Sequence, residues 1–366
     1  MSPDIDARTR GHWHKSLENG RLLCTLCPRA CQLLDQQRGF CFVRQRRGES
    51  IELTSYGQAS GFCIDPVEKK PLLHFYPGTP VLSFGTAGCN LGCRFCQNWD
   101  ISKARDLERS STGGRPEQVA QTATAWGCSA VAFTYNDPVI FAEYAIDTAK
   151  ACHALGIQTI AVTAGYIASA ARKEFFSVMD GANIDLKAFT PEFYEQLCAA
   201  EIGPVLDTLR FVRRETATWL ELSTLLIPGR NDSMDELGRL CDFVLEELGD
   251  DVPLHFSAFH PDYRLLDVPV TPPDTCRRAR TLALSRGLRF VYTGNIQDKR
   301  GQSTYCPQCG DEVIGRDRYQ LRGWNMVGTH CGSCSAKIPG RFSEAGPGDF
   351  GPRRIPVCVP SSPARR

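Results

Sequence analysis

The sequence lacks an excess of charge of either sign. Its 366 residues carry 42 lysine and arginine side chains and 41 aspartate and glutamate side chains, which leaves a formal net charge of +1 at pH 7. A broad nucleic-acid-binding surface needs clustered positive charge. The short basic run that contains Arg44, Arg46 and Arg47 is more typical of a solvated loop than of a phosphate site. The composition therefore disfavours nucleic acid as a partner.

Long apolar runs are also absent from the sequence. A membrane-spanning helix needs ~20 consecutive apolar residues, and no segment approaches that length. The first residues, MSPDIDARTRGHWHK, contain no apolar stretch of signal-peptide length. We therefore expect a cytoplasmic protein without membrane contact. Because hydrophobic residues still make up 42% of the chain, it can bury a sizeable core.

Cysteine, in contrast, is abundant. The chain has 18 cysteines, and a reducing cytosol would not keep that many as disulfides. Eleven of them fall in three tight groups, a distribution that indicates metal binding. The other seven stand alone and are predicted to be small buried hydrophobic residues. These are Cys63, Cys128, Cys152, Cys198, Cys241, Cys276 and Cys358.

The chain divides into four regions. Residues 1–77 form an irregular, Cys-rich N-terminal segment, and residues 78–296 alternate short β-type runs with helical stretches. Residues 297–342 return to cysteine and glycine, and residues 343–366 read as a disordered tail because they are rich in glycine, proline and polar residues. We therefore expect one large domain with small appendages.

The middle region determines the fold class. Strands separated by helices imply βα units, hence an α/β protein with a parallel sheet and right-handed crossovers. Six or seven such units make either an open sheet or a curved partial barrel. Chemistry is then expected at the carboxyl ends of the strands. The predicted strands are 81–84, 130–134, 158–162, 182–186, 219–227, 254–259 and 288–292. The predicted helices are 116–126, 139–155, 168–179, 191–197, 234–248 and 273–286.

A cysteine triad follows the first predicted strand, in the segment GTAGCNLGCRFCQNW. Cys89, Cys93 and Cys96 have the spacing C-x3-C-x2-C. A 4Fe–4S cluster normally takes four cysteine ligands, so three local ligands leave one iron free to bind another molecule. The alternative is a zinc site with a distant fourth ligand, but structural zinc sites usually bring paired C-x2-C knuckles. The spacing therefore predicts a 4Fe–4S cluster.

This triad, with the aromatic Phe95 before its last cysteine, resembles the signature of the radical S-adenosylmethionine (SAM) superfamily. The resemblance implies a partial (β/α)6 TIM-type barrel of parallel strands over residues 78–296. It also implies that SAM binds the open iron and is reductively cleaved to a 5′-deoxyadenosyl radical, which abstracts hydrogen from an unidentified substrate. A reductant such as flavodoxin or ferredoxin is an implied partner.

The same resemblance assigns residues to SAM. Phe95 is expected against the adenine. After the second strand the family usually has Gly-Gly-Glu, whereas this chain has Asn136 and Asp137, of which Asp137 can supply the carboxylate for the SAM amino group. Thr163 corresponds to a ribose contact. Ile227 resembles the adenine-side isoleucine of the family, although a buried strand end would explain it equally well.

Asp185 and Lys187 resemble the Asp-x-Lys of glycyl-radical activating enzymes. A lysine at this place pairs with the SAM carboxylate as a compact point charge. Alternation along a strand puts both side chains on one face. The alternative is an ordinary surface ion pair.

A narrower resemblance covers nearly the whole chain. The strings IDPVEKKPLLHFYPGTP, CQNWDIS, YNDP, NIDLKAFTPEFY, ELSTLLIPGRND, LHFSAFHPDY and YTGN are similar to those of the AmmeMemoRadiSam-system radical SAM proteins, relatives of pyruvate-formate-lyase activating enzymes. This implies Memo-like and AMMECR-type proteins as candidate partners. The reaction is either activation of a protein or modification of a small molecule, and Asp-x-Lys favours the first. The alternative function is a non-catalytic iron–sulfur or zinc protein for electron transfer or scaffolding.

Two further segments are candidates for contact with substrate. His260 and Tyr263 follow the sixth predicted strand and are expected to face the cavity, although a lone histidine is more often structural. The charged segment 65–74 either caps the barrel mouth, touches substrate or is a polar lead-in loop.

The N-terminal cysteines have the spacing C-x2-C-x3-C-x9-C. Four thiolates over eighteen residues, from Cys24, Cys27, Cys31 and Cys41, can enclose one metal centre. Zinc and an auxiliary iron–sulfur cluster are both compatible with this spacing. The Cys27-Pro28 pair slightly favours an iron–sulfur cluster, which could relay electrons to the first.

The C-terminal cysteines form two C-x2-C knuckles, 21 residues apart, from Cys306, Cys309, Cys331 and Cys334. This is the zinc-ribbon pattern, and zinc on four thiolates is preferred over iron because short chains without a core need a metal to fold. The ribbon either docks a partner or forms a lid on the active site.

Overall fold

The computed structural model of the chain describes residues 11–105 and 113–359. A nine-stranded sheet dominates it, with the strand order β13-β12-β11-β10-β9-β8-β7-β6-β19. Seven neighbouring strands run parallel and alternate with helices. These are β7 Pro80–Gly85, β8 Ala130–Phe133, β9 Gln158–Thr163, β10 Gly181–Asp185, β11 Trp219–Leu226, β12 Leu254–Ala258 and β13 Val291–Gly294.

The predicted α/β class with a central parallel sheet is confirmed. The sheet stays open, because β13 and β19 at its two ends have no second neighbour among the described strands. The parallel part contains seven strands, one more than a (β/α)6 barrel has. The last one begins at Val291 and not at the predicted residue 288, because 288–290 belong to the turn and lead-in after the preceding helix.

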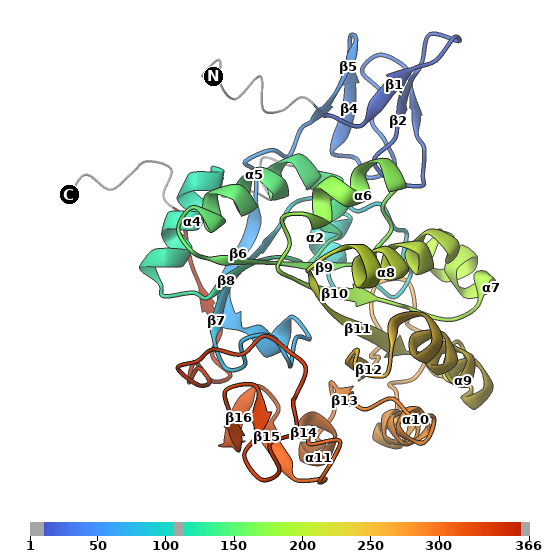
Figure 1. Cartoon of the computed structure of the whole chain (residues 1–366). Coiled ribbons are helices and arrows are strands. Elements are labelled where there is room, and N and C mark those ends of the chain that lie inside the picture. The colour runs from blue at the N-terminus through green and yellow to red at the C-terminus, as the bar shows by residue number, and fades with distance from the viewer. Residues whose placement is uncertain (1–10, 106–112, 360–366) are drawn as a thin grey trace.

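The helices lie along one side of the curved sheet (Figure 1). None of the described helices is long and apolar enough to cross a membrane. The longer ones are α4 Pro116–Ala125, α5 Ala142–His153, α6 Ser169–Phe176, α8 Gly203–Glu215, α9 Met234–Phe243 and α10 Pro273–Ser285. The short turns are α2 Trp99–Ser102, α7 Pro191–Phe193, α11 Lys299–Gln302, η1 Val67–Lys69, η2 Pro138–Phe141, η3 Tyr194–Cys198 and η4 Val244–Leu248.

One helix, α8, is not predicted from the sequence. Its start, Gly203-Pro204, resembles a turn, but proline within the first helical turn loses no hydrogen bond. Its buried residues Val205, Thr208, Leu209 and Val212 follow the helical i, i+3, i+4, i+7 spacing.

The N-terminal segment forms two small antiparallel sheets that pack on the helices (Figure 1). One contains β1 His14–Ser16, β2 Leu22–Cys24 and β3 Gln32–Leu33, and the other contains β4 Arg44–Arg47 and β5 Ser50–Leu53. The expectation of a solvated basic run is wrong for Arg44. Its guanidinium is buried and forms a two-pronged ion pair with Glu143 of α5, with both N···O distances 2.8 Å. Burial of this charge is tolerated because the opposite charge is buried with it.

The C-terminal residues close the opposite end of the fold. The hairpin of β15 Glu312–Asp317 and β16 Gln320–Trp324 pairs with β14 Thr304–Tyr305, and β17 Met326–Val327 pairs with β18 His330–Cys331. Val313, Ile314 and Met326 pack in one apolar cluster with Leu73 and Tyr292. This module therefore packs against β13 and against the segment that precedes β7.

The prediction of a disordered tail over residues 343–366 is wrong for part of that segment. Ile355–Pro356 forms strand β19, which pairs antiparallel with β6 Ser60–Pro66 at the edge of the main sheet. Phe350 and Val359 are buried. The composition of 343–366 hides this strand because an edge strand of two residues tolerates proline. Residues 360–366 lie outside the described part.

Candidate active site

The cysteine triad opens into a cavity inside the curved sheet. Cys89, Cys93 and Cys96 follow β7 and all line this cavity, which has a volume of about 810 Å³. It extends from the carboxyl ends of the parallel strands, where the triad lies, to the segment 65–73 before β7. Six of the seven residues that the sequence assigns to SAM also line it: Phe95, Asn136, Asp137, Thr163, Asp185 and Lys187.

The cysteine loop has a fixed shape. Gly88 has a φ of +88°, and a Cβ at this position would lie 2.1 Å from the carbonyl oxygen of Cys41, so only glycine fits. Asn136 donates from Nδ2 to the carbonyl of Gly88 at 2.7 Å and accepts from the amide of Thr86 at 3.2 Å. Both polar atoms of the Asn136 side-chain amide therefore bind the backbone of the cysteine loop and hold its shape.

The far side of the loop rests on the end of η3. The amide of Gly92 donates to the carbonyl of Cys198 at 2.8 Å, and the amide of Arg94 donates to the carbonyl of Leu197 at 2.9 Å. These bonds bring the side chain of Cys198 against Cys93, a contact that the sequence does not predict. A hydrogen bond from Cys198 lowers the pKa of the Cys93 thiol to about 7, against the effect of burial.

The three thiols fit a cluster with an open coordination position. They are not gathered as tightly as the ligands of a single ion, because no three metal-ligating atoms of the described loop residues lie within 4.8 Å of one another. Cys198, the nearby fourth thiol, is buried behind Cys93 and is not part of the cavity wall. Three sulfurs therefore face the space in which a cluster would sit, and the fourth does not.

Asp137 joins the ends of two strands. Its Oδ1 accepts from the amide of Val139 at 3.1 Å and from the hydroxyl of Thr163 at 2.8 Å, and its Oδ2 accepts from the amide of Ala164 at 3.1 Å. Burial raises the pKa of Asp137 to about 6, although these three donors oppose the shift. A carboxylate offers about four lone-pair sites, so one acceptor position is left toward the cavity.

Asp185 and Lys187 form an ion pair, with 2.8 Å between Lys187 Nζ and Asp185 Oδ2. Lys187 is 14% exposed, so this is not an ordinary surface pair. Burial alone would lower the pKa of Lys187, but Asp185 and the thiols of Cys93 and Cys198 hold it well above its usual value. A permanent positive charge therefore lies beside the triad.

Comparison with known proteins identifies the family. Residues 84–244 match the radical SAM superfamily. An uncharacterized protein of Methanocaldococcus jannaschii is 38% identical over 89% of this chain and 97% of its own length. The chain contains a radical SAM domain. The pyruvate formate-lyase-activating enzyme of Listeria monocytogenes is 25% identical over 46% of this chain and 70% of its own length.

Among solved structures, a domain of a pyruvate-formate lyase-activating enzyme from Bacteroides vulgatus aligns with a TM-score of 0.41 and 18% identity. The alignment covers 46% of this chain and 99% of that domain. The radical SAM family implies a 4Fe–4S cluster and SAM as cofactors, and its members are enzymes that use an external reductant. The family match and the sequence relatives confirm the predicted radical SAM class and its relation to activating enzymes.

Three of the predicted residues in this radical SAM protein lie away from the cavity wall. Ile227 is fully buried, and its amide donates to Asn231 Oδ1 at 2.7 Å. His260 Nδ1 pairs with Gln97 Nε2 at 2.8 Å, and the ring of Tyr263 stacks on Trp99 with 5.8 Å between centroids. His260 and Tyr263 thus support the segment that follows the triad.

Several polar residues of the deeper cavity are not predicted from the sequence. Asn183, Ser223 and His255 lie inside the apolar runs of β10, β11 and β12, and their side chains line the cavity. Polar residues within buried strands are the available signal, since such residues need partners. His255 has one: its Nε2 lies 2.7 Å from Glu221 Oε2.

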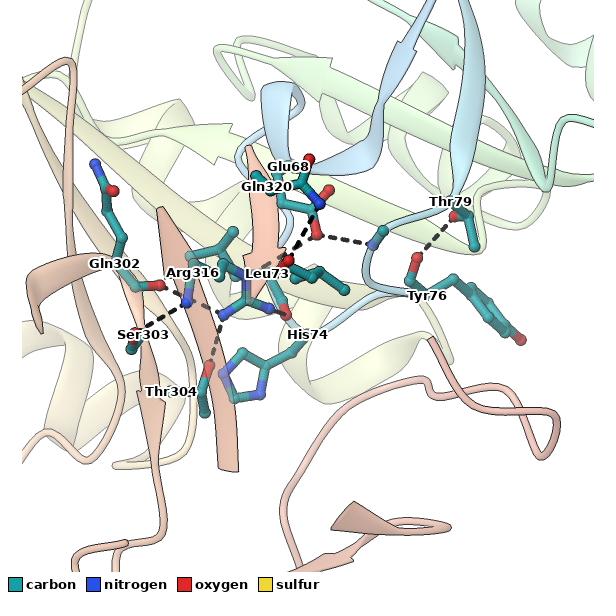
Figure 2. A network of polar contacts seen from close by, with 12 residues as sticks. Glu68, Leu73, His74, Tyr76, Thr79, Gln302, Ser303, Thr304, Arg316 and Gln320 are labelled. Carbon is teal, nitrogen blue, oxygen red and sulfur yellow. Dashed lines mark hydrogen bonds and ion pairs between the residues drawn. The ribbon is translucent and has the colours of Figure 1, made fainter. Parts of the chain in front are cut away.

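A buried polar network lies at the far end of the cavity, where Glu68, Leu73 and Arg316 line it; Figure 2 shows the contacts of this network. Arg316 of β15 donates to the carbonyl of Leu73 at 2.7 Å and to the hydroxyl of Thr304 at 2.9 Å, and its Nε lies 3.9 Å from Glu68 Oε1. Burial raises the pKa of Glu68, while the charge of Arg316 opposes the shift. Segment 65–74 therefore does not cap the mouth of the cavity: it lines the opposite end, where it contacts the C-terminal module.

The sulfur atoms of the four C-terminal cysteines lie close together. The sulfurs of Cys306 and Cys334 are 3.5 Å apart, and those of Cys309 and Cys331 are 3.7 Å apart. Within the described residues, this is the only group of three or more such ligands whose atoms all lie within 4.8 Å of one another. The distances suit a single tetrahedral ion, because bonds of ~2.3 Å to a zinc ion put its sulfur ligands ~3.8 Å apart.

Proposed function

We propose that this protein binds a 4Fe–4S cluster through Cys89, Cys93 and Cys96 and uses it to cleave SAM reductively. When bound, the cluster and SAM supply a 5′-deoxyadenosyl radical, which abstracts a hydrogen atom from the substrate. One observation carries the proposal: three thiols line the cavity while the fourth thiol beside them, Cys198, lies behind its wall.

The residues around the triad have complementary tasks in this proposal. Asp137 accepts the SAM ammonium at its remaining lone pair, and Lys187 faces the SAM carboxylate with the donors that Asp185 leaves free. Phe95 is buried to 4% exposure and packs on Phe193, so its ring is fixed for contact with the adenine. Thr163 keeps Asp137 in place and is the candidate ribose contact.

We further propose that the substrate is a small polar molecule held inside the barrel and not a protein segment at its mouth. The cavity continues below the triad to Lys70 and Arg316. Asn183 Oδ1 and Ser223 Oγ have no hydrogen-bond partner among the described residues, although both side chains are buried. Unpaired buried polar atoms are costly unless a ligand or water satisfies them.

The remaining partners belong to the same proposal. The C-terminal ribbon binds zinc, as its sulfur distances favour. A flavodoxin or ferredoxin supplies the electron, and Memo-like and AMMECR-type proteins are candidate companions. We expect the protein to act in the cytoplasm.

The central test is SAM cleavage by the anaerobically reconstituted protein. After addition of iron and sulfide, reduction by dithionite and addition of SAM, we expect 5′-deoxyadenosine to be released. Cys93→Ala should lose both the cluster spectrum and the product, and SAM cleavage by that variant would refute the ligand assignment. An intact cluster without any product in the wild type would instead support the electron-carrier alternative.

A further inference from the structure

The four N-terminal cysteines converge in one small enclosed site. Cys24, Cys27, Cys31 and Cys41 line it together with apolar side chains such as Leu26. Cys27 lies close enough to the other three thiols to interact electrostatically with each of them. The site is assembled from two sheets, because Cys24 ends β2 and Cys41 precedes β4. Four convergent thiols beside Arg29 and Arg44 are a suitable ligand set for a metal centre.

The spacing of these thiols distinguishes between the possible metals. No three of their sulfurs lie within 4.8 Å of one another, in contrast to the four of the C-terminal ribbon. A single tetrahedral zinc ion holds its sulfurs ~3.8 Å apart, so these sulfurs are less closely gathered than the ligands of a zinc ion. Four cysteines at wider spacing match the ligand set of a 4Fe–4S cluster. In addition, the amide of Phe40 donates to Cys31 Sγ at 3.5 Å, and hydrogen bonds of this kind tune cluster potentials.

The N-terminal site lies directly behind the catalytic cysteine loop. Asn90 lines the N-terminal site, whereas its neighbours Cys89 and Leu91 line the large cavity, so the two sites share a wall one residue thick. Arg29 holds Asn90 in place, because its Nε donates to the carbonyl of Asn90 at 2.7 Å. The tight contact of Gly88 with the carbonyl of Cys41 joins the two loops at a second point.

We propose that Cys24, Cys27, Cys31 and Cys41 hold a second 4Fe–4S cluster that passes electrons to the catalytic one. The electron-relay part rests on the proposed function, whereas the metal assignment does not. One electron moves from an external donor of the flavodoxin or ferredoxin class to the N-terminal cluster. That cluster is reoxidised as the catalytic cluster is reduced. The electron is consumed when the C5′–S bond of the SAM sulfonium breaks, which yields methionine and the 5′-deoxyadenosyl radical.

The geometry accounts for the direction of transfer. The catalytic triad faces a cavity that SAM and substrate fill, so an external protein has no free approach to it from that side. Cys31 is partly exposed, and next to it Phe40 is 47% exposed. The N-terminal site therefore offers a donor an accessible edge, and Asn90 lies between it and the catalytic loop.

The metal assignment is tested in a variant that lacks the catalytic ligands. Cys89→Ala, Cys93→Ala and Cys96→Ala are combined in the full chain, which is reconstituted anaerobically with iron and sulfide and analysed for metals and by EPR. We expect about four irons and four sulfides per chain to remain, with the EPR signal of a reduced cluster. Loss of all iron, or about two zinc ions per chain in place of iron, would overturn the proposal. Failure of the wild type to cleave SAM affects only the proposed function, because this measurement does not involve SAM.

The relay is tested by Cys31→Ser, with Cys358→Ala as the control because Cys358 is exposed and isolated. The iron of the catalytic cluster and its spectral response to SAM are measured first, to establish that its loop is folded. Reduced flavodoxin is then mixed with each protein, and reduction of the catalytic cluster is followed by freeze-quench EPR. We expect Cys31→Ser to slow this step at least ~10-fold and Cys358→Ala to leave it unchanged. An unchanged rate in Cys31→Ser would refute the relay.

Discussion

At the scale of single residues, two thiols with different roles lie in contact. Cys93 lines the cavity and Cys198 does not, although the two share a hydrogen bond. If Cys198 were a fourth ligand, no iron would be left open for SAM. The roles of these two cysteines therefore decide between a catalytic cluster and an electron-transfer cluster.

This difference predicts the outcome of Cys198→Ala. We expect the variant to keep its iron and to cleave SAM, because only a buried hydrogen-bonding neighbour of Cys93 is lost. Loss of a buried thiol typically costs ~1–3 kcal/mol, so the melting temperature should fall. Iron content and 5′-deoxyadenosine release are the measurements, with Cys93→Ala as the matched variant. Loss of one iron in Cys198→Ala would show that Cys198 is a ligand.

Asp137 predicts a pH dependence of SAM binding. Its pKa is raised to about 6 by burial, and only its ionised form attracts the SAM ammonium. Affinity should therefore be full above pH 6 and should fall as pH decreases through that value, by roughly tenfold per pH unit below it. Asp137→Asn should bind more weakly with no such pH dependence. Titration of SAM into the reconstituted protein at several pH values measures both, and parallel pH profiles would contradict the role of Asp137.

At the scale of elements, the cysteine loop depends on close backbone contacts. Gly88 combines a φ of +88° with contact to Cys41, whereas Gly127 has a φ of +64° and no heavy atom within 4 Å of the point that a Cβ would occupy. A residue with a side chain is destabilised by ~1–2 kcal/mol in the left-handed conformation alone. Substitution of either glycine would therefore carry this conformational cost. Only substitution of Gly88 would also cause a steric clash.

This pair predicts different results for two alanine variants. Gly127→Ala should lower the free energy of unfolding by ~1–2 kcal/mol and leave cluster content unchanged. Gly88→Ala should displace the loop and lose most of the catalytic iron, since the backbone of Cys41 cannot move away without disturbing the N-terminal site. Iron content and thermal unfolding distinguish them. Equal iron content in the two variants would show that the loop tolerates the displacement.

The elements also show how far the sequence predicts the structure. All seven parallel strands are predicted, because strands buried on both faces, such as β8 with Ala130–Phe133, read as continuous apolar runs. The cysteine groups are recognisable because their spacing is local. The contact of Cys198 with Cys93 and the role of Asn136 as a loop support are not predictable, because each joins segments that are distant in sequence.

At the scale of the whole molecule, two segments that are distant in the sequence meet at the far end of the cavity. The segment before β7 and the hairpin of the C-terminal ribbon meet through Glu68, Leu73 and Arg316 (Figure 2). The sequence predicts that the ribbon either docks a partner or forms a lid. Arg316 and Tyr319 line the cavity, so the ribbon forms part of its wall. A zinc ion in the ribbon would therefore contribute to the substrate site indirectly, by folding that wall.

This geometry predicts the result of filling the cavity. Ser223→Leu adds apolar volume to the cavity wall, opposite Asp185 in the register of β10 and β11, whereas Ser223→Ala removes only the hydroxyl. With dithionite, the rate of SAM cleavage without substrate is measured first in each variant as its own reference, because Ser223 lies opposite Asp185. A small-molecule filtrate of a cell extract should stimulate cleavage by the wild type but not by Ser223→Leu, and Ser223→Ala should respond more weakly than the wild type. Stimulation of Ser223→Leu by the filtrate would show that the substrate binds elsewhere. Stimulation of the wild type by the protein fraction alone would favour an activating enzyme that acts on a protein. The cavity, lined at its far end by two segments about 250 residues apart in the sequence, is thus the feature by which the substrate class can be decided.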